Sequence, residues 1–220
     1  MQTEGPRPDN PERPLFFTDA VVAIALTLLV LPLLEGVPKD IPGDLRASQW
    51  LGEHWAQIIS FVASFAVLAS FWVTHNRVMT YVARFPGPLM VLNLLWMALV
   101  VFLQIPSALM YETVTDRGIL GLYIGTMTAT SFVMSLMAAL IWRHPEWQVV
   151  PGSFGWERAS VSWVVSGLYV CAMAIAMIIP SLGLSPSFGF FSLAVLAFVG
   201  PIHSMVVRLV RRRQQLTADA

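Results

Sequence analysis

The chain has 220 residues, of which 56% are apolar and only 12% are charged. A soluble domain carries about 25% charged residues, so this composition excludes an ordinary soluble domain and indicates a membrane protein. The 13 basic and 13 acidic residues cancel to a net charge of 0, which removes the electrostatic basis for binding nucleic acid. The single cysteine, Cys171, cannot form an internal disulfide and is expected to be a small buried side chain.

Six apolar segments are long enough to span a membrane, because about 20 helical residues cross a hydrocarbon layer about 30 Å thick. They cover, in chain order, about 15–34, 55–79, 88–110, 119–142, 159–179 and 187–210. Lipid offers no hydrogen-bond partner to an open backbone, and a spanning strand needs only about 9 to 11 residues. The predicted fold class is therefore an all-α membrane protein with six transmembrane helices.

Three parts of the chain follow from this prediction. Residues 1–14 form an N-terminal segment, residues 15–210 a six-helix transmembrane domain, and residues 211–220 a basic tail. The first apolar segment is longer than the core of a cleaved secretory signal, which has about 7 to 15 residues. We therefore expect it to be retained as a membrane helix.

The basic residues predict the orientation. The side that holds both termini and the second and fourth connections also holds Arg7, Arg13, Arg77, Arg84, Arg143, Arg158, Arg208, Arg211, Arg212 and Arg213. The other side holds Lys39, Arg46 and Arg117. Because cytoplasmic connections carry an excess of Lys and Arg, both termini are predicted to be cytoplasmic, in a multi-pass protein of the cell membrane.

The sequence contains no motif typical of a catalytic site or of a metal site. The histidines fall on separate elements, without Cys or Glu at ligand spacing: His54, His75, His144 and His203. There is no nucleophile elbow, no phosphate-binding glycine loop and no pair of intramembrane catalytic aspartates. We therefore predict a protein that is not an enzyme and that has neither a metal site nor a cofactor.

The first predicted helix carries the most informative motif. It opens with Arg13, followed by Phe17, Thr18 and Asp19. This spacing resembles the Arg-x-x-x-Phe-Ser-Asp signature of the transmembrane protein 175 family of potassium channels, with threonine in place of serine.

Two later elements resemble the same family. The second helix ends with Trp72 and His75, similar to the family's Trp-x-x-His element. The third carries Leu92–Asn93 and later Pro106, similar to the family's Leu-Asn and proline positions. The motifs cover the first 110 residues, and beyond them the resemblance rests on hydropathy alone.

The resemblance implies a potassium-selective leak channel that assembles as a homotetramer in membrane lipid, with the permeant potassium ion in place of a cofactor. In that family the first helices of four subunits surround the ion path. Its members lack the Thr-Val-Gly-Tyr-Gly filter of ordinary potassium channels, and this sequence lacks it too. The resemblance therefore implies a pore lined by side chains.

Helical spacing supplies a separate observation on the first helix. At about 100° per residue, Ile24, Leu28 and Leu31 lie within about 60° of one another, and Thr27 borders this stripe. Asp19 lies about 140° from Ile24, so it is a poor candidate for an ion ligand. The resemblance implies a constriction at Ile24, where a ring of isoleucines would form a hydrophobic gate. Ordinary packing of the stripe is the alternative.

The resemblance also implies a structural polar cluster near the cytoplasmic ends of the first three helices: Arg13, Phe17, Thr18, Asp19, Trp72, His75 and Asn93. A carboxylate entering the low-dielectric region needs a partner, and Arg13, His75 and Asn93 can donate to Asp19. We interpret the cluster as a clasp that fixes the pore helix.

Two local features carry packing expectations. Pro32 has no amide hydrogen for the carbonyl of Leu28, so the first helix is expected either to kink or to end there. Gly121 and Gly125 have the spacing that lets helices approach closely, and we expect them to pack within the chain.

Two other functions remain open on the sequence. One is a proton-coupled secondary transporter, or a proton pathway, that uses Asp19 and His75 as a relay. The other is a noncatalytic membrane scaffold. A channel of this kind is not expected to be gated by voltage, because no helix carries an arginine at every third residue.

Overall fold

The computed structural model describes residues 11–35, 47–112 and 116–178, and this part of the chain is helical apart from its connections. The helices are α1 (Glu12–Leu28), α2 (Leu31–Glu35), α3 (Ala47–Glu53), α4 (Trp55–Met79), α5 (Gly87–Phe102), α6 (Gln104–Glu112), α7 (Arg117–Arg143), the 3-10 turn η1 (Pro145–Trp147) and α8 (Trp156–Ile178). Five helical stretches are long and apolar enough to cross a membrane: Glu12–Glu35, Trp55–Met79, Gly87–Met110, Arg117–Arg143 and Trp156–Ile178. The predicted sixth segment, 187–210, and the predicted tail, 211–220, lie outside the described residues.

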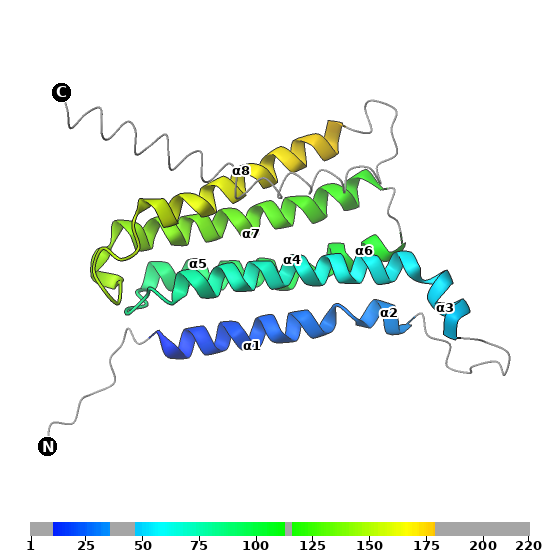
Figure 1. Cartoon of the computed structure of the whole chain (residues 1–220), viewed down its shortest axis with the longest axis horizontal. Coiled ribbons are helices and arrows are strands. Elements are labelled where there is room, and N and C mark those ends of the chain that lie inside the picture. The colour runs from blue at the N-terminus through cyan, green and yellow to red at the C-terminus, as the bar shows by residue number, and fades with distance from the viewer. Residues whose placement is uncertain (1–10, 36–46, 113–115, 179–220) are drawn as a thin grey trace, which may run out of the picture.

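The long helices run side by side as a bundle (Figure 1). Helix α1 lies along one side and contacts α4 and α5, while α7 packs against α5, α6 and α8. In α7, 61% of the most apolar stretch is buried, against 17% in α4. The core of the chain therefore surrounds α7, and α1 and α4 leave most of their apolar surface uncovered.

Small residues bring α7 and α8 together. A Cβ atom on Gly121 would lie 3.6 Å from the sulfur of Met177, and one on Gly125 would lie 3.7 Å from the terminal methyl of Met173. The expected packing of this glycine pair within the chain is therefore observed. About two turns further along α7, the Ser166 hydroxyl lies 3.0 Å from that of Ser131 and 2.8 Å from that of Ser135. These hydrogen bonds join the buried faces of the two helices.

Cys171 is exposed on α8, so the expectation of a buried thiol is wrong. Helix α8 turns Tyr169, Ala172 and Ala176 toward the core. The cysteine lies about 200° from Tyr169 on the helical wheel and therefore falls on the uncovered face.

Prolines interrupt two of the five spans. Helix α1 ends at Leu28 and the chain resumes as α2 at Leu31, whereas α5 ends at Phe102 and resumes as α6 at Gln104. In each case the last residue of the first helix lies four residues before a proline, Pro32 or Pro106, which has no N–H to offer its carbonyl. The break expected at Pro32 is thus present, and Pro106 produces a second one.

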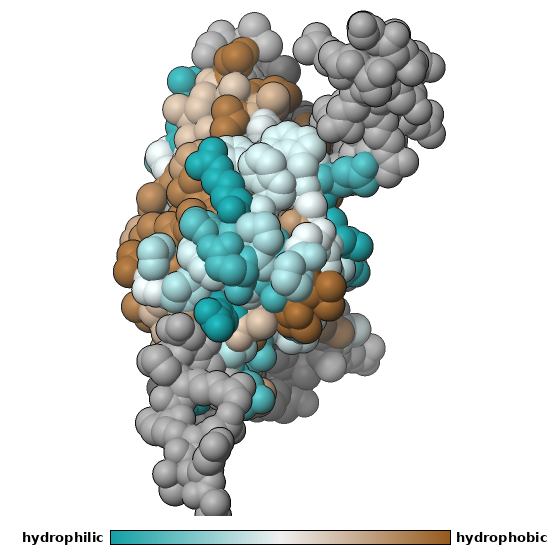
Figure 2. Space-filling model, turned by 90° about the vertical axis from the view of Figure 1, so that its left-hand side faces the viewer, coloured by the Kyte–Doolittle hydropathy of each residue, from teal (hydrophilic) through white to brown (hydrophobic). Residues whose placement is uncertain are grey.

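One end of the bundle collects the start of α1, the end of α4, the start of α5, the end of α7 and the start of α8 (Figure 1). We call it the basic end, because it holds Arg13, Arg77, Arg84, Arg143 and Arg158 among the described residues, whereas Arg117 begins α7 at the opposite end. Figure 2 views the molecule from this end, where hydrophilic side chains gather beside an apolar flank.

Backbone hydrogen bonds join the two connections at the basic end. The amides of Ala83 and Arg84 donate to the carbonyl of Trp147 at 2.7 and 3.2 Å, and the amide of Val149 donates to the carbonyl of Tyr81 at 2.9 Å. The α4–α5 and α7–α8 connections therefore hold each other in place.

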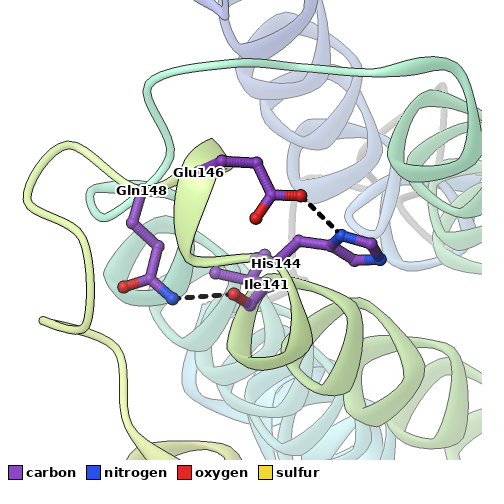
Figure 3. Close-up of polar contacts among 4 residues, drawn as sticks. All are labelled: Ile141, His144, Glu146 and Gln148. Atoms are coloured by element: carbon purple, nitrogen blue, oxygen red, sulfur yellow. Dashed lines mark hydrogen bonds and ion pairs between the residues drawn. The ribbon is translucent and has the colours of Figure 1, made fainter.

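Gln148 closes the α7–α8 connection from inside (Figure 3). Its buried amide nitrogen donates to the carbonyl of Ile141 at 2.7 Å, and its amide oxygen accepts from the backbone of Phe154 at 3.0 Å. Gln148 thereby satisfies a carbonyl of the last turn of α7, where no further helical amide follows.

Glu146 lies on the outer side of the same connection (Figure 3). Its carboxylate accepts from its own backbone N–H and from His144 Nδ1, the latter at 2.7 Å. Both bonds lower the pKa of Glu146, and the backbone bond has the larger effect. A lowered carboxyl pKa contributes stability above the ordinary pKa and loses it as pH falls through the lowered one. Acidification therefore loosens this outer contact, while the Gln148 contacts stay.

Candidate functional site

A chain of buried hydrogen bonds connects α4, α5 and α1. His75 Nε2 donates to Asn93 Oδ1 at 2.8 Å, and Asn93 Nδ2 donates to Thr18 Oγ1 at 2.8 Å. Thr18 Oγ1 in turn donates to the carbonyl of Pro14 at 2.8 Å. Asn93 and Thr18 are completely buried, so each donor has an acceptor where no water can replace it. We call this chain of hydrogen bonds the polar clasp; it joins α1 to α4 and α5 at Thr18.

A second contact between α1 and α4 lies one residue further along α1. Trp72 Nε1 donates to Asp19 Oδ1 at 2.8 Å, and Asp19 is exposed in the single chain. The ring of His75 stacks on that of Trp96, with centroids 4.4 Å apart. Trp72 therefore positions Asp19, and Trp96 positions His75.

The predicted cluster is only partly assembled in this form. The structure brings together Thr18, Asp19, Trp72, His75 and Asn93. Arg13 and Phe17 are exposed, Phe17 by 58%, and lie outside the hydrogen-bonded chain because their helical face points away from α4 and α5. The donor to Asp19 is the indole of Trp72, rather than one of the three donors that the sequence suggested, Arg13, His75 and Asn93.

The opposite face of α1 carries the predicted apolar stripe. Ile24, Leu28 and Leu31 are exposed by 59, 42 and 47% in the single chain, whereas Val22 on the packed face is 1% exposed. Ile24 lies about 160° from Val22 on the helical wheel. Helix α1 is therefore anchored on one face and uncovered on the other.

Thr27 borders this stripe and is exposed. Its hydroxyl donates to the carbonyl of Ile24 at 2.8 Å. Because the hydroxyl hydrogen is used in this bond, the group presents oxygen lone pairs to its surroundings.

A half-open pocket of about 240 Å³ lies between the two proline breaks and is lined by Leu28, Leu29, Leu31, Pro32, Gln104, Ser107 and Ala108. Buried polar atoms of Gln104 and Ser107 have no hydrogen-bond partner. Both residues follow the end of α5 at Phe102, which lies four residues before Pro106, and Gln104 begins α6. The described residues contain no group of three His, Cys, Asp or Glu side chains that could hold a metal ion.

Comparison with known proteins identifies the family. Residues 13–103 match the family model described as endosomal/lysosomal potassium channel TMEM175. A potassium channel of Streptomyces collinus is 36% identical over 129 residues, which cover 58% of this chain and 61% of the relative. A potassium channel of Chamaesiphon minutus is 31% identical over 144 residues, which cover 64% and 68%.

A mammalian relative matches over a shorter region. The endosomal/lysosomal proton channel TMEM175 of Bos taurus is 34% identical over 98 residues, which cover 42% of this chain and 20% of the relative. The chain thus spans about three fifths to two thirds of the bacterial relatives and a fifth of the bovine one.

A solved structure agrees in fold. The crystal structure of a lysosomal potassium-selective channel TMEM175 homolog from Chamaesiphon minutus superposes with a TM-score of 0.64 at 25% identity, covering 88% of this chain and 96% of that one. Together with the apolar helices, this match identifies a multi-pass membrane protein. The chain belongs to the TMEM175 family, a family of ion channels and not of enzymes.

Proposed function

We propose that the chain is one subunit of a homotetrameric, potassium-selective leak channel whose pore is lined by α1. The observation that carries this proposal is the two-sided construction of α1. The polar clasp holds one face against α4 and α5, while Ile24, Leu28 and Leu31 stand exposed on the other. An exposed apolar stripe on an anchored helix is suited to face an axis shared by several copies. The bacterial relatives named as potassium channels support the same function.

In this proposal Ile24 forms the constriction. A ring of isoleucine side chains holds back water and ions by dewetting until it widens. Thr27, three residues further along, adds oxygen lone pairs beside the ring because its hydrogen is bonded to the Ile24 carbonyl. Those oxygens offer a partly dehydrated cation a partial replacement for water.

The orientation in the proposal follows the basic end. Five of the arginines in the described part of the chain lie there: Arg13, Arg77, Arg84, Arg143 and Arg158. An excess of basic residues is typical of the cytoplasmic side. We therefore propose a cell-membrane channel with its basic end, and with it the start of α1, in the cytoplasm.

Planar-bilayer recording of the purified protein tests the function. Under a potassium/sodium gradient we expect discrete unitary currents that reverse near the potassium equilibrium potential. A transporter or a scaffold gives no unitary current, so a silent bilayer containing folded, oriented protein contradicts the proposal.

A second candidate function is a proton pathway, which the naming of the bovine relative as a proton channel favours. Asp19 and His75 are the groups that would carry it. The contacts argue against a direct relay, because Asp19 is bonded to Trp72 and His75 to Asn93.

Asp19→Asn separates the two functions. The amide oxygen still accepts from Trp72 Nε1, so we expect the protein to fold. Because this contact is kept, the barrier to potassium should change by well under about 1.4 kcal/mol, and potassium flux in vesicles should stay within about twofold of wild type. A relay instead predicts that proton uptake, measured with an internal pH dye, disappears while potassium flux is unchanged. Loss of assembled protein would indicate that the charge itself is structural.

A further inference from the structure

A second cavity lies at the basic end of the bundle, between the end of α4 and the start of α8. Its volume is about 470 Å³, and it is lined by Thr74, Asn76, Arg77, Val78, Thr80, Tyr81, Phe154, Arg158, Val161 and Ser162. Two arginines are among its lining residues, and no Asp or Glu is. The hydroxyls of Thr74 and Thr80 already donate to the carbonyls of Ser70 and Arg77. The free donors of the cavity therefore come mainly from Arg77, Arg158 and Asn76.

Arg158 is positioned in advance. Its Nη1 donates to the carbonyl of Ser153, and its guanidinium carbon lies 4.9 Å from the centroid of the Tyr81 ring. A guanidinium has five N–H donors in a planar fork that suits phosphate oxygens. One is used by Ser153, so the others remain for a ligand, and the fixed side chain loses little rotamer freedom on binding.

The depth of the cavity matches the membrane interface. Arg77 lies two residues before the end of α4, and Arg158 lies two residues after the start of α8. The rings of Trp142 and Trp156 pair at the same end, 5.1 Å apart, and tryptophan is enriched where lipid headgroups meet water. Val78, Phe154 and Val161 give the cavity an apolar part beside its cationic part.

From this combination we propose that the cavity binds the phosphate group of an anionic phospholipid. Arg77 and Arg158 hold the phosphate oxygens, and the partly exposed side chains of Val161 and Tyr81 contact the glycerol and the first carbons of the chains. Inorganic phosphate carries the same negative charge but has no apolar group that could contact the apolar part of the cavity. The proposal does not depend on the channel function, because the site lies between α4 and α8 and away from the exposed face of α1.

Binding of a fluorescent phosphatidylglycerol to the purified full chain in neutral detergent tests the site. We expect saturable binding that short-chain phosphatidylglycerol displaces, and that phosphatidylcholine and inorganic phosphate displace poorly. Arg77→Gln should weaken binding about fivefold, the effect of about one interfacial basic residue. Arg158→Gln should weaken it at least as much, and Arg158→Lys, which keeps the charge but not the fork, should fall between.

Arg143→Gln is the matched control, because Arg143 lies at the same end and does not line the cavity. We expect the Arg143→Gln variant to bind phosphatidylglycerol as tightly as wild type does. Equal losses in the Arg143 and Arg77 variants would reduce the effect to general attraction and overturn the site. Displacement by inorganic phosphate as strong as by phosphatidylglycerol would overturn the lipid assignment. Arg77 is exposed, so its variant is expected to fold, and thermal unfolding of each variant verifies this.

Discussion

Ile24→Asn is expected to raise passive potassium flux by about tenfold, which corresponds to lowering the barrier by about 1.4 kcal/mol. The physical reason is wetting: an amide in place of each isoleucine lets water stay in the narrowest part of the proposed pore. The substitution should leave the fold intact, because the side chain is 59% exposed in the single chain and takes no part in its core. Flux from vesicles loaded with potassium, normalised to the release by an ionophore, measures the effect.

Val62→Asn is a matched control for this experiment. Val62 is a β-branched residue on α4 that is 56% exposed, so the same amide is added to an uncovered membrane helix outside α1. We expect its flux to equal that of wild type, and we expect Ile24→Phe, which narrows the ring, to lower it. Unchanged flux for substitutions at Ile24, Leu28 and Leu31 would overturn the placement of α1 at the pore.

Among the described residues, several helices begin close to the starts that hydropathy predicts. The predicted segment 55–79 coincides with α4, whereas α7 and α8 begin two and three residues before their predicted starts. Hydropathy locates the apolar core of a helix, but a spanning helix continues into the polar interface. Arg117 and Glu157 therefore read as connections although they belong to helices.

The contacts within the site were less predictable. The motifs indicated that Asp19, His75 and Asn93 lie near one another, because they lie near the ends of helices that meet at one end of the bundle. Which donor reaches which acceptor depends on the rotation of α1 against α4, and the donors suggested for Asp19 did not include Trp72. Gln148 gave no signal at all, because its partners Ile141 and Phe154 converge on it only when the connection folds.

The clasp and the proposed pore are mechanically linked, since both belong to one helix. The buried stripe of α1 consists of Thr18, Val22 and Ala25, and Thr18 is the member fixed by hydrogen bonds. A rotation of α1 by one residue, about 100°, would carry Ile24 from the exposed face toward α4 and α5. In the proposed channel, the hydrogen bonds of Asn93 would therefore determine which residue of α1 faces the common axis.

Asn93→Ala is accordingly expected to lower the free energy of unfolding by about 2 kcal/mol, because it removes two hydrogen bonds and leaves the buried His75 N–H without an acceptor. Unfolding in mixed detergent micelles measures this loss. Asn76→Ala, the same substitution on an exposed asparagine of α4, should change stability by less than about 0.5 kcal/mol.

Thr18→Ala extends the test of the clasp. Because Asn93 donates directly to Thr18, the double variant should lose at least about 0.5 kcal/mol less than the sum of the two single variants. Strictly additive losses would contradict a direct contact.

If the clasp sets the rotation of α1, the Asn93 variant should also change potassium flux in the fraction that remains folded. A purely local packing defect would instead lower the amount of folded protein and leave the flux per folded channel unchanged.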